Sequence, residues 1–174
     1  LGYSPKEFEV LYKYRKLTDR QRAYILDKMD FEIAMQTLET DPKNMLDVLV
    51  LTGDLKDGMI LDSSHEERVY CPEYIQKYGE TLHCGIRITS NNLHPVYVKG
   101  DIICISKRPP RNGETLVVIH KPTGRAYIRR YVQGNMTKLK PINGLGDVIE
   151  VDPNSFEDMN QWVKFGVVIA VLRR

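Results

Sequence analysis

The chain has 174 residues, of which 42% are apolar and 28% are charged, and its net charge is +2. These values are ordinary for a soluble globular protein, and the sequence contains no internal repeat and no low-complexity tract. A nearly neutral chain is an unusual DNA-binding domain when it stands alone, because such domains are generally basic.

Residues 1–45 are predicted to be helical. Ser4-Pro5-Lys6-Glu7 and Thr18-Asp19-Arg20-Gln21 are capping boxes, which mark the starts of two helices. Apolar residues recur at helical spacing after each box, and Asp41-Pro42 ends the second helix. One interpretation is a helical hairpin that packs on its own domain or on a partner chain. The other is a connector that follows a removed N-terminal helix-turn-helix domain.

From about Val48 the apolar period changes from 3.6 to 2, which predicts a β-domain over residues 46–174. With no helices expected between the strands, the fold class is mainly β with N-terminal helices, and the antiparallel strands curl on themselves. The expected strands are Val48–Leu51, Met59–Leu61, Arg68–Cys71, Leu82–Ile88, Val96–Val98, Ile102–Ser106, Thr115–His120, Ala126–Val132, Lys138–Pro141, Val148–Val151 and Val163–Arg173.

The cysteines, Cys71, Cys84 and Cys104, are widely spaced and form no CxxC pair. This pattern favours buried thiols in a reducing compartment. The histidines and cysteines repeat no ligand spacing, so we expect no metal and no other cofactor. We also expect a cytoplasmic protein without membrane contacts, because no apolar run approaches the roughly 18 residues of a membrane span and no signal peptide is visible.

The stretch GIRITSNNLHPVYVKGD, residues 85–101, carries a family resemblance. Arg87-Ile88 leads into Ser90-Asn91-Asn92, and Pro95 and Gly100-Asp101 follow in a fixed register. This pattern resembles the core motif of the LexA-like repressors, whose C-terminal domains are self-cleaving serine peptidases of the S24 type. The resemblance implies a curled antiparallel β-domain of the LexA/signal-peptidase type. Further segments that resemble the family are Arg111–Val118, Ala126–Tyr131, Leu139–Asn143 and Phe165–Arg173.

In that family a serine hydroxyl attacks the chain's own peptide bond and a neutral lysine takes its proton. The register places Asn92 at the serine position, Arg129 at the lysine position and Asp57-Gly58 at the cleavage site. A carboxamide is not nucleophilic and a guanidinium keeps its proton, while Ser90 lacks a titratable partner. The resemblance therefore implies a pseudo-peptidase without catalytic residues. We also expect Asn92 to donate to a backbone carbonyl and Arg129 to pair with a carboxylate, for which Asp57 is the candidate.

The resemblance implies the C-terminal dimerisation and regulatory domain of a phage-like or mobile-element repressor. Such a domain forms a homodimer and reaches operator DNA through an N-terminal helix-turn-helix domain, which we expect to be missing from this fragment because it begins with Leu. Without self-cleavage, an antirepressor protein, a peptide or a ligand would have to control it. Two alternatives stay open, an active LexA-like self-cleaving peptidase with an unusual site and a stand-alone protein-binding module. We expect most of the basic positions to be solvated or ion-paired, and these are Lys107-Arg108 with Arg111, Arg129-Arg130 and Arg173-Arg174. We expect Trp162 to be a core or dimer contact.

Overall fold

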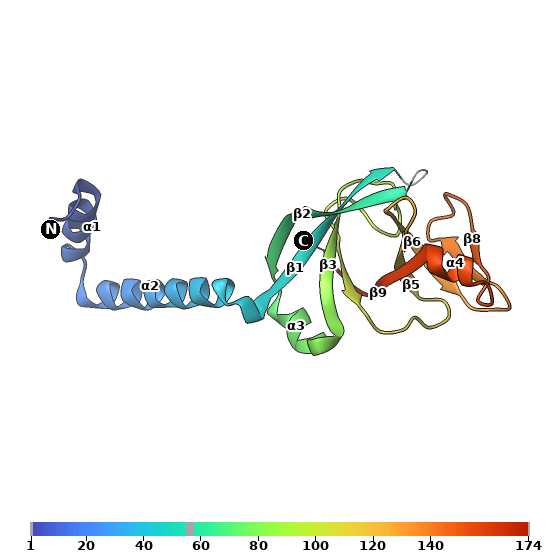
Figure 1. The fold of residues 1–174 in the computed structure, drawn as a ribbon. Helices are drawn as coiled ribbons and strands as arrows, with labels where there is room; N and C mark the ends of the chain where they lie inside the picture. Colours follow the sequence, from blue (N-terminus) through green and yellow to red (C-terminus); the bar gives the residue numbers. More distant parts are fainter. Residues whose placement is uncertain (1, 55–57, 174) are drawn as a thin grey trace. The chain divides into compact units, whose positions relative to one another are not determined.

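The computed structural model of the chain describes residues 2–54 and 58–173, with side chains at all of these positions except 54 and 62–66 (Figure 1). The chain forms two compact units, residues 1–44 and residues 45–174. Within the described residues, the first unit is helical and the second holds every strand.

The first unit consists of α1 (Pro5–Arg15), α2 (Asp19–Thr40) and a short 3₁₀ turn. Both predicted capping boxes are present, and they satisfy backbone N–H groups that have no partner within a helix. The Glu7 carboxylate accepts from the Ser4 amide at 2.6 Å, and the Thr18 box has the same arrangement. The prediction of two helices, ended at Asp41-Pro42, is confirmed.

Arg22 ties α2 to the end of α1. Its guanidinium donates to the carbonyl oxygens of Arg15, at 2.6 Å, and Tyr14, at 3.3 Å. These carbonyls belong to the last turn of α1, where the Tyr14 carbonyl also accepts from the Leu17 amide at 3.2 Å. Arg22 therefore links the two helices by polar contacts at the turn between them, and whether they act as a hairpin or as a connector stays a prediction.

No described residue of α1 or α2 is buried. Tyr24, Met29, Phe31 and Ile33 each expose more than half of their surface. Most helices in proteins gain their stability by packing an apolar face against something else. These helices carry an apolar surface that no described residue of the first unit covers. In the described part of the chain, no helix combines the length and the apolarity that crossing a bilayer requires.

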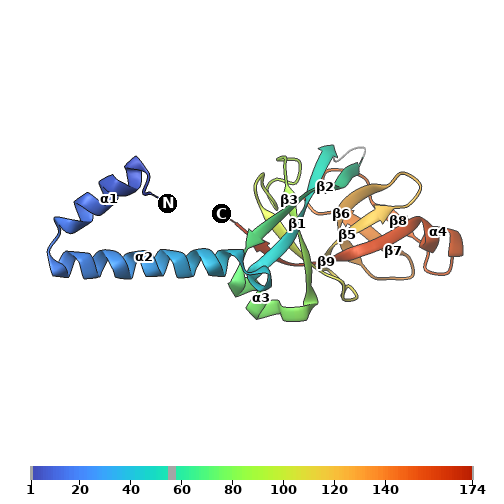
Figure 2. The ribbon, with the colours of Figure 1, turned by 60° about the vertical axis from the view of Figure 1, so that its left-hand side comes forward.

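The second unit is built on one curled sheet, with the strand order β2-β1-β3-β4-β9-β5-β6-β7-β8 among the described residues (Figures 1 and 2). An extra pairing of Met59 in β2 with Ala126 in β6 brings distant strands of this order together and gives the sheet a barrel-like form. The strands are β1 (Met45–Asp54), β2 (Gly58–Tyr70), β3 (Leu82–Ile88), β4 (Ile102–Ser106), β5 (Thr115–His120), β6 (Arg125–Val132), β7 (Thr137–Pro141), β8 (Ile149–Val151) and β9 (Trp162–Leu172). The prediction of a mainly β chain with N-terminal helices is confirmed.

One strand pairing departs from the predicted antiparallel arrangement. β1 and β3 run parallel, with Val48 opposite Gly85. Parallel neighbours need a long connection between them, and here β2 and α3 (Pro72–Tyr78) supply it. Met59–Leu61 and Arg68–Cys71, expected as separate strands, both fall on β2 apart from Cys71 itself, which precedes α3.

The expectation that no helix interrupts the strands was wrong. α3 begins with Pro72 at its first turn, a position that proline favours. α4 (Phe156–Gln161) begins after Ser155, whose hydroxyl accepts from the Asp158 amide at 3.2 Å. Both starting signals are visible in the sequence, but these helices are too short to show an apolar period.

The predicted strand Val96–Val98 was also wrong, because this segment is a turn. The carbonyl oxygen of Leu93 accepts from the amides of Val96 and Tyr97 at 3.0 and 3.1 Å. Leu93 and Tyr97 are both buried, so the apolar pattern of this stretch reflects side chains that the turn directs into the core.

The core of this unit has three clusters of buried side chains. The largest includes Ile86, Ile103, Ile105 and Val117, and the second joins β1 to β4. The third lies on β5 to β8 and is flanked by Trp162. With this much internal burial, residues 45–174 have the properties of an independently folding domain.

Candidate functional site

The side chain of Asn92 is held at the start of the loop that follows β3. Its Nδ2 donates to the carbonyl oxygen of Gly53 at 3.3 Å, which is the predicted bond to a backbone carbonyl. Three residues earlier in the same segment, the Thr89 hydroxyl donates to the carbonyl of Leu51 at 2.5 Å. Asn92 therefore acts as a structural donor that fastens this loop to the end of β1.

Arg129 is buried in β6 and exposes only 3% of its surface. Its Nη1 donates to the carbonyl of Ile128 at 3.0 Å, but its Nε has no hydrogen-bond partner among the described atoms. Burial lowers the pKa of the Arg129 guanidinium, and the neighbouring Tyr127 and Asp147 oppose that shift. The charge is thus held where water cannot solvate it, which costs stability unless a counterion is present.

No carboxylate among the described side chains lies within 4.0 Å of the Arg129 guanidinium. The sequence-based candidate for this partner, Asp57, lies outside the described residues. The pairing of Arg129 with Asp57 therefore stays a prediction.

One loop reaches both Asn92 and Arg129. Asn143, just after β7, donates through Nδ2 to the carbonyl oxygens of Asn92 at 2.8 Å and His94 at 3.2 Å. Three residues later, the backbone of Gly146 runs so close to Arg129 that a Cβ there would lie 3.3 Å from Nη2. The loop after β7 therefore brings the two positions of the predicted dyad into one neighbourhood.

Sequence reasoning missed the role of this loop. In the sequence, the segment Leu139–Asn143 carries only the family resemblance. An asparagine before a glycine in a turn commonly bonds to nearby backbone. Nothing local, however, indicates that the acceptors lie about fifty residues earlier in the chain.

The β1–β2 hairpin rests against β6. Arg125 donates through Nη1 to the carbonyl of Gly58 at 3.1 Å. Gly58 has a φ of +79°, and a Cβ there would lie 2.6 Å from the Tyr127 ring, so only glycine fits this contact. Every second residue of a strand lies on the same face, and β6 places Arg125, Tyr127 and Arg129 on one face in this way. The strand that carries Arg129 thus also receives Gly58, the predicted cleavage-site residue.

These contacts describe a site that holds the hairpin but lacks the groups for peptide hydrolysis at the positions that the resemblance assigned. A carboxamide that donates to a carbonyl cannot act as a nucleophile, and a guanidinium cannot accept a proton near neutral pH. The Ser90 hydroxyl accepts from the Asn92 amide at 3.4 Å. Neither Asn92 nor Arg129 can serve Ser90 as a general base.

The expected ion pairs of the basic positions are present at two places. Arg108 forms a two-pronged pair with Glu114, at 2.6 and 2.9 Å, and this bond together with the Arg111 amide lowers the pKa of Glu114 to about 2. Arg173 lies 3.5 Å from the buried carboxylate of Asp101. These arginines close loops of the fold rather than forming a free basic patch.

The three cysteines are buried. Burial raises the pKa of Cys84 and of Cys104 to about 11, so both stay protonated and unreactive near neutral pH. Among residues 2–54 and 58–173, no group of three His, Cys, Asp or Glu side chains is arranged to hold a metal ion.

No protein-family model matches the chain, and no curated protein matches it in sequence.

Proposed function

We propose that this chain is the C-terminal dimerisation and regulatory domain of a phage-like or mobile-element transcriptional repressor that has lost self-cleavage. Its fold would be a catalytically silent form of the LexA-type β-domain. Operator DNA would be bound by a helix-turn-helix domain that precedes this chain in the full-length protein.

The observation that carries the proposal is the chemistry at Asn92 and Arg129. The two residues stand at the positions where the resemblance requires a serine and a lysine, and the loop after β7 touches both. Each has a packing role instead, Asn92 as a donor to Gly53 and Arg129 as a buried cation. Ordered residues without catalytic groups at these two positions favour a binding role for the domain over an enzymatic one.

The exposed apolar surface of α2 supports a second copy of the chain as its partner. Ile25, Met29 and Ile33 form an open apolar groove, which is flanked by Lys28 and Glu32. Two antiparallel copies of this helix would place Lys28 of one opposite Glu32 of the other, so the surface is complementary to itself. Pairing two domains in this way would allow two DNA-binding domains to grip a two-fold operator cooperatively.

If the chain cannot cut itself, release from DNA requires a bound effector. An antirepressor protein, a peptide or a small ligand that binds the β-domain or the helices would serve. Any such effector has to bind the DNA-free dimer more tightly than the DNA-bound dimer. An effector with equal affinity for both would not shift the equilibrium between them.

The first test is incubation at about pH 10, near the pKa of a free lysine amine, where a lysine-dependent peptidase gains its base. We expect the chain to stay intact by mass spectrometry, while an active self-cleaving repressor run in parallel is cut. A fragment that ends near residue 57 would restore the peptidase interpretation. The Asn92→Ala variant would then show whether that cut depends on the site.

The second test measures association by light scattering over a concentration series. We expect the full chain to be a dimer, and we expect residues 45–174 alone to dimerise at least tenfold more weakly because they lack the α2 groove. A full chain that stays monomeric would contradict the dimerisation proposal. Equal association of both forms would instead remove the helices from the interface.

A further inference from the structure

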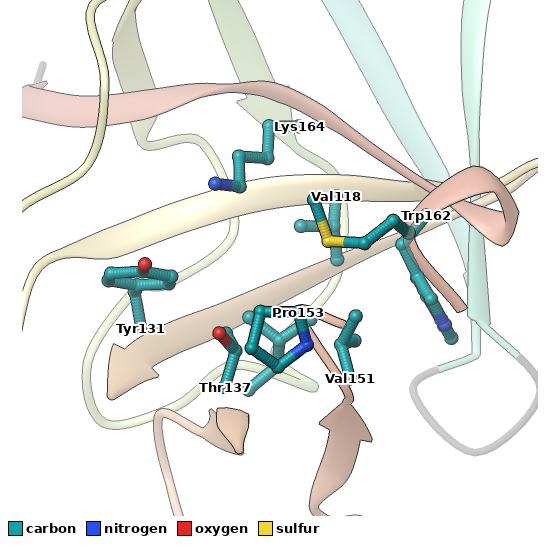
Figure 3. Close-up of a pocket in the computed structure, with 9 residues that line it drawn as sticks. Val118, Tyr131, Thr137, Val151, Pro153, Trp162 and Lys164 are labelled. Carbon is teal, nitrogen blue, oxygen red and sulfur yellow. The ribbon is translucent and has the colours of Figure 1, made fainter. Parts of the chain in front are cut away.

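A cavity of about 150 Å³ lies outside the Asn92 and Arg129 site, between the face of β5 to β8 and the segment of α4 and β9 (Figure 3). Most of its wall is apolar and includes Val118, Val151, Met159 and the ring of Trp162. An engineered protein cavity of similar volume takes up benzene. One aromatic ring or one branched aliphatic group therefore fits this space.

One edge of the cavity is cationic. The Lys164 ammonium points toward Tyr131 in Figure 3 and lies 5.3 Å from the centre of that ring, while Trp162 and Val151 stand at the other end. No acidic side chain in the described part of the chain lies within 4.0 Å of Lys164. Thr137 adds a hydroxyl to the lining. The cavity is thus mainly apolar, and at its edge lies a cation that no described carboxylate contacts.

The apolar wall is held in place before any ligand arrives. The Trp162 ring packs against His120, at 4.6 Å between ring centres, and edge-on against Tyr127, at 5.6 Å. A wall that is fixed by its neighbours costs little to order on binding. Tyr127 also contacts Arg129 and approaches Gly58, so the same ring joins the cavity wall to the β1–β2 hairpin.

We propose that this cavity binds a small carboxylic acid that carries one aromatic or branched aliphatic group. The apolar group lies against Val118, Met159 and Trp162, and the carboxylate pairs with the Lys164 ammonium at the edge. Ligand pockets of this kind are mainly apolar and contain a few polar groups that orient the ligand. This inference is independent of the repressor proposal, because it rests only on the cavity and its charge.

Trp162 is the only tryptophan in the chain, so intrinsic fluorescence reports directly on the cavity. The probes are phenylacetate, 3-methylbutanoate and the neutral analogue phenylacetamide, and calorimetry checks each titration. We expect both acids to give a saturable change, with phenylacetate binding at about 1 mM or tighter for a ligand of its size. Phenylacetamide should bind at least tenfold more weakly than phenylacetate, because it carries no charge for Lys164.

Lys164→Met tests the charge while keeping a side chain of similar length. We expect it to weaken phenylacetate binding at least tenfold and to leave phenylacetamide binding unchanged. Lys140→Met, at an exposed position of β7 that does not line the cavity, is the matched control and should bind as the unmodified chain does. Circular dichroism establishes that both variants are folded.

Three results would overturn the proposal. The first is the lack of any saturable signal from either acid up to about 10 mM, the weak limit for a specific ligand of this size. The second is equal affinity for phenylacetate and phenylacetamide. The third is a folded Lys164→Met variant that binds phenylacetate as tightly as the unmodified chain.

Discussion

Replacement of Arg129 by methionine is expected to raise the free energy of unfolding of residues 45–174 by about 1–3 kcal/mol. Methionine has a similar volume, occupies much of the same buried space and removes a charge that no described carboxylate contacts within 4.0 Å. The gain is reduced by the loss of the bond to Ile128 and of the contact with the Tyr127 ring, each worth about 1 kcal/mol. Urea denaturation measures the difference.

Arg130→Met is the matched control, since Arg130 is the next residue of the same strand but is exposed. We expect it to change stability by less than about 0.5 kcal/mol. A loss of about 3 kcal/mol or more in Arg129→Met would contradict the prediction, because that is the cost of breaking a buried ion pair. The hypothesis that Asp57 pairs with Arg129 would then be favoured, and the Asp57→Asn variant would show whether the two losses are coupled.

Replacement of Gly166 by alanine is expected to lower the free energy of unfolding by about 3 kcal/mol. Gly166 lies in β9, opposite Val117 of β5. A Cβ at this position would lie 2.3 Å from Cγ2 of Ile105 and 2.8 Å from the carbonyl oxygen of Ser106. Because the second of these atoms belongs to the backbone, the strand itself has to move to admit a methyl group.

Gly134→Ala provides the control for this substitution. A Cβ at Gly134 meets only the carbonyl of Met136, at 3.4 Å, and its φ lies outside the left-handed region. We expect little change or a small gain there, because alanine restricts the unfolded chain more than glycine does. If both alanine variants melt alike, the close approach of β9 and β4 at Gly166 is not a constraint on the fold.

Features that depend on neighbouring residues were predictable from the sequence. Each capping box joins side chains and amides three residues apart, so the boxes at Ser4 and Thr18 predict the starts of their helices directly. β3, β4 and β5 also follow their predicted boundaries, since alternating or continuous apolar runs between turn signals mark strands. The turn at Val96–Val98 shows the limit of this signal, because a turn with buried side chains gives the same apolar pattern as a strand.

Features that depend on distant segments were not predictable in the same way. The parallel pairing of β1 with β3 follows from the path of the chain through β2 and α3, which no local pattern records. At the site, the sequence related Asn92 to Arg129 through the family register but did not indicate Asn143, which bonds to Asn92 from 51 residues away. The sequence also did not predict the burial of Arg129, because an arginine in a strand is usually solvated.

The course of β9 has a consequence for how the second unit unfolds. Its first half pairs with β5 and its second half pairs with β4, so this single strand joins the two parts of the sheet. Neither half of the sheet can lose that segment without exposing the interior of the other. Residues 45–174 should therefore melt in one cooperative transition, without a half-folded species, even though their buried side chains form separate groups.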